Sequence, residues 1–289
     1  MAKPVLSLIG AGRLGSSLAA ALAAQGYAVQ GVCDRDRRIA QDTAQALAAA
    51  VAGDEPTAVC AGADIVLLAV PDAQIKPVSE RLAAGGTLRK GQVICHTSGF
   101  LPSSVLVAVK FSGAYAVSMH PMMSFTRRLS GPEVFRGVSF ALEGDAVAVA
   151  AARELATALD GFAVVIRPQD KPLYHAAAVM SSNYLVTLLA QSVALLGRAG
   201  IGADQAAQML LPLAGGVIGG LADGELAAAL TGPIERGDAI TVEGHIRALK
   251  NAQPQQLEVY KALARSTLAM VRDRLPTDQV QALEWTIDQ

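Results

Sequence analysis

The N-terminal part of the chain alternates short apolar runs with longer stretches that are rich in alanine. The apolar runs predict strands at residues 5–9, 28–33, 64–70, 92–96, 115–119, 138–142 and 162–166. Alanine is the best helix former, so the stretches between them predict helices at residues 16–25, 38–51 and 145–159. The run at 64–70 is almost continuously apolar, as expected for a parallel strand buried on both faces. The pattern predicts an α/β fold with a doubly wound, mostly parallel sheet.

The amino-acid composition changes after residue 167. The rest of the chain is almost entirely helical in composition, with breaks at residues 197–202, 215–220 and 232–233 and at Pro254. We therefore expect an α/β domain over residues 1–167 and an all-helical domain over residues 168–289. A length of 289 residues agrees with two domains.

Charge and cysteine content exclude several classes of function. The 24 basic and 25 acidic residues give a net charge of −1, so there is no basic excess to bind nucleic acid. Three cysteines in so long a chain do not form a disulfide framework, and the cysteines and four histidines lack metal-ligand spacing. We expect neither a nucleic-acid partner nor a bound metal.

The mean hydropathy of +0.37 raises the question of a membrane segment. A transmembrane helix needs about 20 consecutive apolar residues. The apolar stretch 177–196 is interrupted by Ser181, Ser182, Asn183, Thr187, Gln191 and Ser192. The first residues also lack the long apolar region of a signal peptide. The sequence favours a soluble, cytoplasmic protein with no membrane partner.

A glycine motif lies between the first predicted strand and the first predicted helix. Gly10, Gly12 and Gly15 form Gly-x-Gly-x-x-Gly inside a β-α-β unit, the context in which this motif binds a dinucleotide. Gly10 permits a tight turn, Gly12 lets the backbone approach a pyrophosphate, and Gly15 lets the helix pack against the strand. The N–H groups of Arg13 and Leu14, at the helix start, are available to phosphates. The alternative is a turn that binds nothing.

The residues after the second predicted strand bear on the choice of cofactor. Asp34 lies about 20 residues after Gly15, where an acidic residue binds the adenosine ribose and favours NAD. Arg35, Arg37 and Arg38 come directly after it, and arginines at this place can hold the 2′-phosphate of NADP. A solvated loop is the alternative for the arginines. We expect NADP(H), and the sequence leaves NAD(H) open.

Several segments resemble known oxidoreductases. The N-terminal half resembles the Rossmann domains of pyrroline-5-carboxylate reductase, ketopantoate reductase and β-hydroxyacid dehydrogenases. Residues 63–72 look like the fourth strand of these domains and the loop over the cofactor, which implies that Val70 and Pro71 bind the cofactor. Further segments are similar to a bacterial oxidoreductase family with a Rossmann-like domain and a helical C-terminal domain: 96–99, 120–125, 173–178, 182–183 and 231–238. Some members of that family are regarded as an alternative type of ketopantoate reductase.

His96 and His120 end two of the predicted strands. Ligands of an open α/β sheet bind beyond the carboxyl ends of the strands, so both histidines are expected near the nicotinamide and the substrate. Ser98 and Gly99 can offer a hydroxyl and a backbone N–H to the substrate or to the nicotinamide amide. For each histidine, the alternative is a packing role at a strand end.

The first long helix of the second domain carries the candidate catalytic groups. His175 and Asn183 are about two turns apart and share a face, with Ser182 on its flank. In related dehydrogenases this helix carries a lysine and an asparagine that act on the substrate carbonyl, and the resemblance gives the lysine's part to Lys171. We expect His175 to donate the proton, with Lys171 and His120 as rivals, and Asn183 to orient the substrate oxygen.

Residues 231–245 are polar in an otherwise apolar domain. Arg236 can clamp a substrate carboxylate, because its guanidinium matches two oxygens. Asp238 is expected to cap the following helix, and Thr241 to face the same site. An Arg236–Asp238 ion pair across the turn is the alternative. Related reductases pack their helical domains in dimers, and by this analogy we expect a homodimer through the helical domain.

The sequence supports three hypotheses for function. The first is an NAD(P)H-dependent reductase of a small carbonyl acid, with 2-dehydropantoate (ketopantoate), reduced to pantoate, as the substrate that the resemblance favours. The second is an imine reductase of the pyrroline-carboxylate type, whose iminium substrate already carries positive charge and needs less help from an acid. The third is a sensor or scaffold that binds NADP without turnover.

Overall fold

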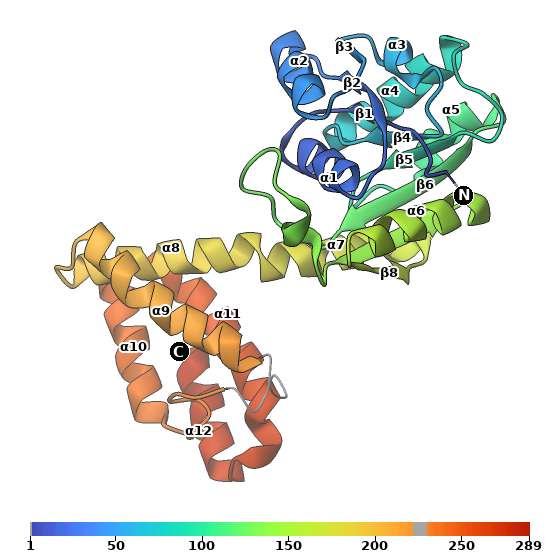
Figure 1. The fold of residues 1–289 in the computed structure, drawn as a ribbon. Helices are drawn as coiled ribbons and strands as arrows, with labels where there is room; N and C mark the ends of the chain where they lie inside the picture. Colours follow the sequence, from blue (N-terminus) through green and yellow to red (C-terminus); the bar gives the residue numbers. More distant parts are fainter. Residues whose placement is uncertain (1, 222–229) are drawn as a thin grey trace. The chain divides into compact units, whose positions relative to one another are not determined.

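The computed structural model describes residues 2–221 and 230–289, shown in Figure 1. The chain divides into two compact units, Met1–Ser182 and Asn183–Gln289. The first unit is an α/β domain, and the second unit is helical.

One sheet forms the centre of the first unit. In the described part of the chain it has eight strands in the order β3-β2-β1-β4-β5-β6-β7-β8. The strands are β1 (Leu6–Ile9), β2 (Val29–Cys33), β3 (Val51–Gly53), β4 (Ile65–Leu68), β5 (Val93–His96), β6 (Tyr115–Pro121), β7 (Ser139–Gly144) and β8 (Phe162–Val165). All neighbours are parallel except β6 and β7, which are antiparallel. The predicted mostly parallel sheet is confirmed.

Helices cover both faces of this sheet, so the doubly wound prediction is also confirmed. The α-helices of the first unit are α1 (Arg13–Ala24), α2 (Arg37–Ala46), α3 (Pro56–Cys60), α4 (Asp72–Ala84), α5 (Val107–Lys110), α6 (Ala146–Ala158) and α7 (Lys171–Ser181). Short 3-10 helices are η1 (Ser103–Leu106), η2 (Pro132–Phe135) and η3 (Pro168–Asp170). Side chains of α1, α2 and α6 join one buried cluster, and side chains of α3, α4 and α5 join another.

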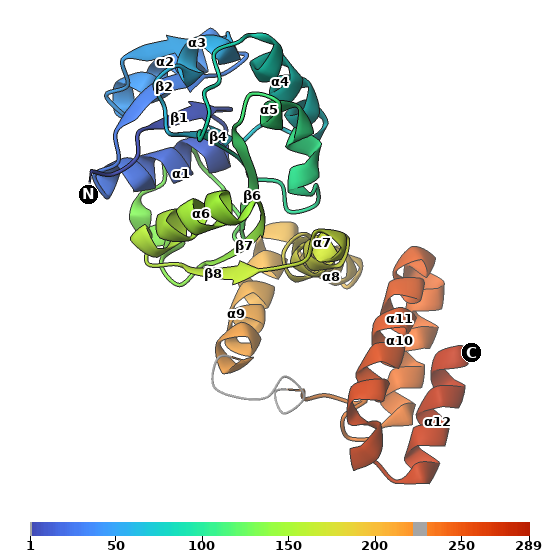
Figure 2. The same cartoon turned by 90° about the vertical axis from the view of Figure 1, so that its right-hand side faces the viewer.

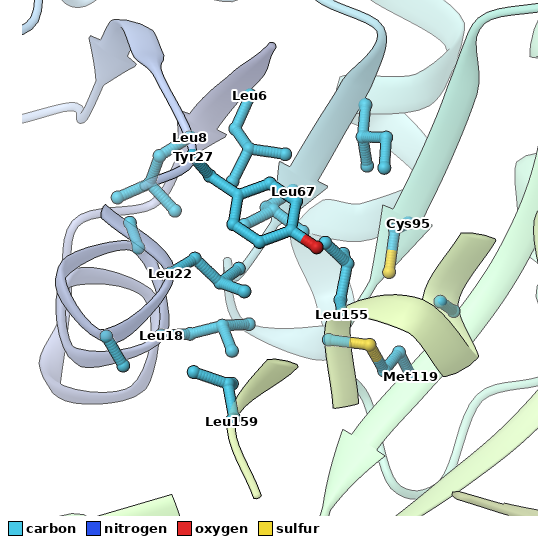
Figure 3. Close-up of a cluster of buried hydrophobic side chains, with 14 of the residues drawn as sticks. Leu6, Leu8, Leu18, Leu22, Tyr27, Leu67, Cys95, Met119, Leu155 and Leu159 are labelled. Carbon is cyan, nitrogen blue, oxygen red and sulfur yellow. The ribbon is translucent and has the colours of Figure 1, made fainter. Parts of the chain in front are cut away.

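The strands divide their side chains between these two clusters. In β4, Ile65 and Leu67 enter the cluster of α1 and α6, whereas Val66 and Leu68 enter the other. Figure 3 shows the first cluster, where leucines of β1 and β4 meet leucines of α1 and of the α6 region. Alternate residues of a strand face opposite sides, so a continuous apolar run is what two covered faces require.

The second unit is all-helical in its described residues, as predicted. Its helices are α8 (Asn183–Arg198), α9 (Ala203–Leu221), α10 (Ala239–Ala252), α11 (Pro254–Val271) and α12 (Thr277–Asp288), with η4 (Arg272–Arg274) before the last. Figure 2 shows α10, α11 and α12 side by side. They share a buried core that includes Val242, Leu268 and Leu283. By contrast, α8 has no buried residue among those described, and α9 has Ala206 alone.

The division between the units falls after Ser182, whereas the sequence places the domain boundary after residue 167. Helix α7 accounts for the difference. Lys171, at its start, is completely buried and donates hydrogen bonds to residues that follow β5 and lie in β6. The backbone then departs from helical geometry at Ser182, with φ −120° and ψ −71°.

The helical stretch Pro168–Arg198 is long and apolar enough in composition to cross a membrane, and its most apolar window is not buried. Core helices of soluble proteins pass the same test of length and composition. The absence of a membrane partner therefore stays a prediction.

All three cysteines lie in the first unit. Cys33, Cys60 and Cys95 are unpaired and buried. Burial raises the pKa of each thiol to about 12, which leaves all three as neutral thiols at physiological pH.

Candidate functional site

The glycine turn joins β1 to α1, and its three glycines have different surroundings. Gly10 has a φ of +94°, and a Cβ there would lie 2.5 Å from the carbonyl oxygen of Ala69. A Cβ on Gly15 would lie 2.1 Å from the carbonyl oxygen of Gly10. A Cβ on Gly12 would meet no described atom within 4 Å. The turn needs Gly10 and Gly15 for its own shape, whereas Gly12 leaves open space beside the backbone.

That open space lies at the start of α1. The helix begins at Arg13, and no side chain caps its N-terminus in the described residues. The first N–H groups of a helix lack partners within the helix and carry partial positive charge, which attracts anions. The N–H groups of Arg13 and Leu14 and the free space at Gly12 thus fit the pyrophosphate of a dinucleotide.

A cavity of about 600 Å³ lies beside the glycine turn. Six residues predicted to bind the cofactor line it: Gly10, Gly12, Asp34, Arg35, Val70 and Pro71. Its volume is in the range of small-molecule sites. The structure therefore gathers these six residues around one cavity at the carboxyl ends of β1, β2 and β4.

The carboxylate of Asp34 is already engaged by the backbone. One oxygen accepts a hydrogen bond from the Ala11 N–H at 2.8 Å, and the other accepts from the Asp36 N–H at 3.0 Å. Arg35 is exposed at the cavity, and Arg37 pairs with Asp54 at 2.9 Å. Asp34 thus supports the glycine turn directly, a role that its position in the sequence did not indicate.

A second group of polar residues lies at the carboxyl ends of β5 and β6, where α7 packs. Lys171 is 0% exposed, and its ammonium donates to the Ser98 carbonyl at 2.9 Å and to Ser118 Oγ at 2.6 Å. Burial lowers the pKa of Lys171 to about 8, although the carboxylates of Glu143 and Asp72 favour its charged form. Lys171 holds positive charge behind the loop after β5.

His120 and Tyr174 form a hydrogen-bonded pair. Nδ1 of His120 lies 2.9 Å from the Tyr174 hydroxyl, and the rings meet edge to face at 5.5 Å between centroids. Burial, with Lys171 and His175 adding to it, lowers the pKa of His120 to about 4. Burial raises the pKa of Tyr174 to about 12. Both groups are therefore neutral at pH 7, and each retains a proton that it can share in a hydrogen bond.

Gly99 lies between the two candidate histidines. A Cβ on Gly99 would be 2.7 Å from Cδ2 of His175 and 2.9 Å from Nε2 of His120. The imidazole rings themselves are 6.1 Å apart between centroids. His175 is partly exposed. The structure thus brings together His120, His175 and Gly99, which the sequence indicated separately.

His96 and Ser98 shape the loop after β5. His96 is 0% exposed; burial lowers its pKa to about 3, and its Nδ1 accepts from the Ser98 N–H at 3.2 Å. Ser98 Oγ accepts from the N–H groups of Phe100 and Leu101. The burial of His96 argues against contact with a substrate, and Ser98 supports the turn through both its hydroxyl and its carbonyl.

The sequence matches two family models, one for each part of the chain. Residues 2–121 match a Rossmann-like domain, and residues 138–267 match a domain of unknown function, DUF2520. Because the DUF2520 match starts at residue 138, it includes β7, β8 and α7 as well as most of the second unit. His175 and Lys171 fall in the DUF2520 part, whereas the glycine turn and His120 fall in the Rossmann-like part.

Solved structures with similar folds come from several bacteria. Protein TM1727 from Thermotoga maritima is 26% identical, with a TM-score of 0.75 over 93% of this chain and 99% of its own. BF3122 from Bacteroides fragilis, named as a candidate NADP oxidoreductase, is 24% identical, with a TM-score of 0.73 over 92% and 98%. A pyrroline-5-carboxylate reductase from Coxiella burnetii is 15% identical, with a TM-score of 0.59 over 99% and 97%. No curated protein gave a significant match.

The remaining predicted residues lie at or beyond the end of the first unit. Ser182 follows the last residue of α7 and its hydroxyl donates to the Ala178 carbonyl, and Asn183 begins α8. His175 and Asn183 therefore do not share one unbroken helix, and the common face expected from their spacing is interrupted at Ser182.

In the turn before α10, Asp238 caps the helix as predicted. Its carboxylate accepts from the Thr241 N–H at 3.0 Å and from the Thr241 hydroxyl at 2.6 Å. Arg236 is exposed, and the described residues contain no ion pair between it and Asp238. Thr241 is thus engaged in the cap, whereas the Arg236 side chain is accessible to a ligand.

Two residues of the polar group at the carboxyl ends of β5 and β6, Tyr174 and Ser118, were not identified from the sequence. Tyr174 stood inside the segment 173–178, beside His175, and its place on a helix one turn from Lys171 was the available signal. Ser118 gave no signal, because an inward-facing serine in a strand looks like any small buried residue.

Proposed function

We propose that this protein is an NAD(P)H-dependent reductase of a small carbonyl acid, with 2-dehydropantoate as the first substrate to test. The observation that carries the proposal is that a dinucleotide-type glycine turn and a cluster of His120, Tyr174 and His175 occupy the same carboxyl edge of one sheet. Ligands of open α/β sheets bind along that edge. Solved structures of similar fold are named as reductases and oxidoreductases, which supports the same class.

NADP(H) is the cofactor that the local geometry favours. Both oxygens of Asp34 are held by backbone N–H groups, so this carboxylate is less available to a ribose diol. Arg35 is exposed and lines the same cavity, and Arg38 is exposed in the first turn of α2, so both can offer positive charge to a 2′-phosphate. NAD(H) remains the cofactor to compare in every assay.

When bound, the cofactor supplies the hydride, and the protein must supply a proton and hold the substrate. His175 is the proton donor in this proposal, because it is partly exposed and lies beside the loop at Gly99. Lys171 is a weaker candidate, since it is fully buried with two hydrogen bonds already made. Neutral His120 would donate a hydrogen bond to the substrate oxygen rather than a proton.

The charge of the site favours an acid as the substrate. Lys171 places a buried ammonium behind Ser98, and its charge attracts a carboxylate or a developing alkoxide more than an iminium. We assign Asn183 to orienting the substrate oxygen and Arg236 to its carboxylate.

A homodimer is part of the proposal. Seven apolar side chains of α8 and α9 are each 51–68% exposed: Tyr184, Val186, Met209, Leu211, Leu213, Val217 and Ile218. Apolar surface of this extent on a soluble protein marks an interface. A second copy of the helical unit is the partner that the proposal assigns to it.

The test measures NADPH oxidation with 2-dehydropantoate, together with NADPH binding. The wild type should turn over, and His175→Ala should lower kcat by about 100-fold or more, because general acids contribute roughly that much. NADPH affinity should stay within about twofold, since His175 is not among the residues that line the cavity at the glycine turn. Normal turnover by His175→Ala would remove the proton-donor assignment.

Imine reduction is the second candidate, because a pyrroline-5-carboxylate reductase shares the fold over nearly the whole chain. A panel that compares keto acids with cyclic imines at equal concentration separates the two. Turnover of imines alone would replace the carbonyl-acid assignment, and binding of NADPH without turnover of any panel member would favour a sensor.

A further inference from the structure

A segment from the end of β6 returns across the first unit to helix α1. We call this segment, residues 122–131, the strap. The backbone N–H of Leu129 donates to Ser16 Oγ at 3.1 Å, and that of Ser130 donates to Ser17 Oγ at 3.0 Å. Both serines are completely buried in the first turns of α1. Buried serines that accept from a loop backbone fix that loop in place, because an unpaired buried N–H is costly.

Arg128 is the residue of the strap that reaches the glycine turn itself. Its Nε donates to the carbonyl oxygen of Ala11 at 3.0 Å. Its Nη2 donates to the carbonyl oxygen of Ile39 at 3.3 Å and to the hydroxyl of Thr43. One guanidinium thus joins the glycine turn to the first turns of α2, and neither partner is close to Arg128 in sequence.

One of these carbonyls belongs to a residue that lines the cavity, and the other belongs to a residue between two that line it. Ala11 stands between Gly10 and Gly12, which line the cavity, and Ile39 lines it from α2. The Asp34 carboxylate accepts a hydrogen bond from the N–H of Ala11, and the Arg128 guanidinium donates one to the carbonyl oxygen of the same residue. With its N–H and its C=O both fixed by charged groups, the turn is held in one orientation before any ligand arrives.

We propose that Arg128 is a positioning residue of the dinucleotide site, an inference that rests on the proposed function. It acts through Ala11 and Ile39: it fixes the glycine turn relative to α2 and so sets the width of the cavity between them. The strap starts directly after Pro121, next to His120, so the same segment ties the cofactor wall to the strand that carries His120.

The first test compares two neighbouring arginines by titration with NADPH. Arg128→Met should weaken NADPH binding by about tenfold or more, since hydrogen bonds to charged groups contribute that much. Arg127→Met is the matched control, because it removes the same charge one residue away. The Arg127 side chain is exposed and forms no hydrogen bond or ion pair within the described residues. Equal losses in the two variants would mean a general effect of charge and would overturn the proposal.

A second measurement does not depend on the Arg128 variant folding. Hydrogen exchange of the wild type should show that NADPH slows exchange of the Leu129 and Ser130 amides as well as those of residues 10–14. Protection of residues 10–14 with no change in the strap would overturn the proposal. Thr43→Val, which removes the Thr43 hydroxyl with little change in volume, should weaken NADPH binding by a smaller factor than Arg128→Met. If Arg128→Met does not give a folded protein, the proposal is overturned when Thr43→Val binds NADPH with unchanged affinity and NADPH does not slow amide exchange in the strap.

The wild type separates this inference from the proposed function. If the wild type binds neither NADPH nor NADH, the proposed function fails. If the wild type binds NADPH and Arg128→Met binds it equally well, the proposed function stands and the role of Arg128 is wrong.

Discussion

At the scale of single residues, Gly99 limits how the candidate site can be built. The backbone of this residue lies against the edges of two imidazoles, so the space for its side chain is already filled by His120 and His175. A residue with a Cβ at this position has to displace at least one ring. The site is therefore sensitive to a single methyl group.

Gly99→Ala should lower kcat/KM by about 100-fold, because a shift of about 1 Å in a catalytic group has effects of that size. NADPH affinity should stay within about twofold, since the glycine turn is untouched. Steady-state kinetics and an NADPH titration measure the two quantities. Gly244→Ala is the control: a Cβ on Gly244 in α10 would meet no described atom within 4 Å. Equal activity of Gly99→Ala and the wild type would show that the two histidines are not catalytic in this arrangement.

Lys171 should make stability depend on pH in the alkaline range. Its pKa is lowered from 10.5 to about 8, so between these values the unfolded chain binds more protons than the native protein. The free energy of unfolding then rises with pH across this window. In Lys171→Met this contribution is lost. Between pH 7.5 and 10, the wild type should gain about 2 kcal/mol relative to the variant.

Urea unfolding of both proteins at the two pH values measures that difference. Comparing the two proteins cancels the titration of other groups, such as the buried thiols. A difference that stays constant with pH would mean that Lys171 is equally protonated in the folded and unfolded states.

Individual residues differ in how far the sequence reveals their roles. The glycines of the turn were predictable, because each meets a steric demand that no other residue type satisfies. Tyr174 and Arg128 were not, because their partners are far away in the chain: His120 for one and Ala11 for the other. His96 was predicted to contact the ligand because it ends a strand; its complete burial could not be read from the sequence.

At the scale of elements, the strand–turn–helix unit of β1 and α1 contains one glycine that is needed for folding and another that is expected to serve ligand binding. Gly15 fits α1 against the turn and Ala69, whereas Gly12 faces open space. The two glycines belong to the same motif but should fail in different ways when a methyl group is added.

Gly15→Ala should lower the melting temperature by several degrees, because overpacking of this kind typically costs about 1–3 kcal/mol. Gly12→Ala should fold normally, yet bind NADPH at least tenfold more weakly, since its methyl group occupies the space assigned to the pyrophosphate. Thermal unfolding and NADPH titration of both variants test this contrast. If Gly12→Ala bound NADPH as the wild type does, the phosphates would have to lie elsewhere.

The sequence predicted most elements of the sheet but not all of their relations. Long apolar runs such as that of β4 identify buried strands. The short edge strand β3 was not predicted, because three residues carry too little pattern; its first residue, Val51, was placed at the end of the predicted helix 38–51. The antiparallel pairing of β7 with β6 was not predicted either, because an apolar run does not indicate the direction of a strand in the sheet. The break between α7 and α8 was missed because the sequence at Ser182 contains neither glycine nor proline.

At the scale of the whole molecule, many apolar side chains of the helical unit lie outside its buried core. Helices α10, α11 and α12 bury their apolar faces together, but α8 and α9 leave large side chains exposed. The proposed homodimer accounts for that surface, and it predicts the mass of the protein in solution.

Light scattering after gel filtration should give a dimer for the wild type without detergent. Leu213→Glu combined with Ile218→Glu should shift the mass to that of the monomer, because two buried carboxylates would face an apolar interface. Leu263→Glu in α11 serves as the control, since it adds the same charge at an exposed leucine outside α8 and α9. Sedimentation of the wild type with lipid vesicles, together with a monomeric mass, would instead favour a membrane as the partner.

The distribution of the three cysteines gives this protein a reporter for one of its two units. Every thiol is buried in the α/β unit, and none occurs after residue 182. A thiol reagent therefore reacts only when the α/β unit opens, and it does not detect opening of the helical unit. Labelling rates with and without NADPH would measure how far the bound cofactor suppresses opening of the α/β unit, without any engineered probe.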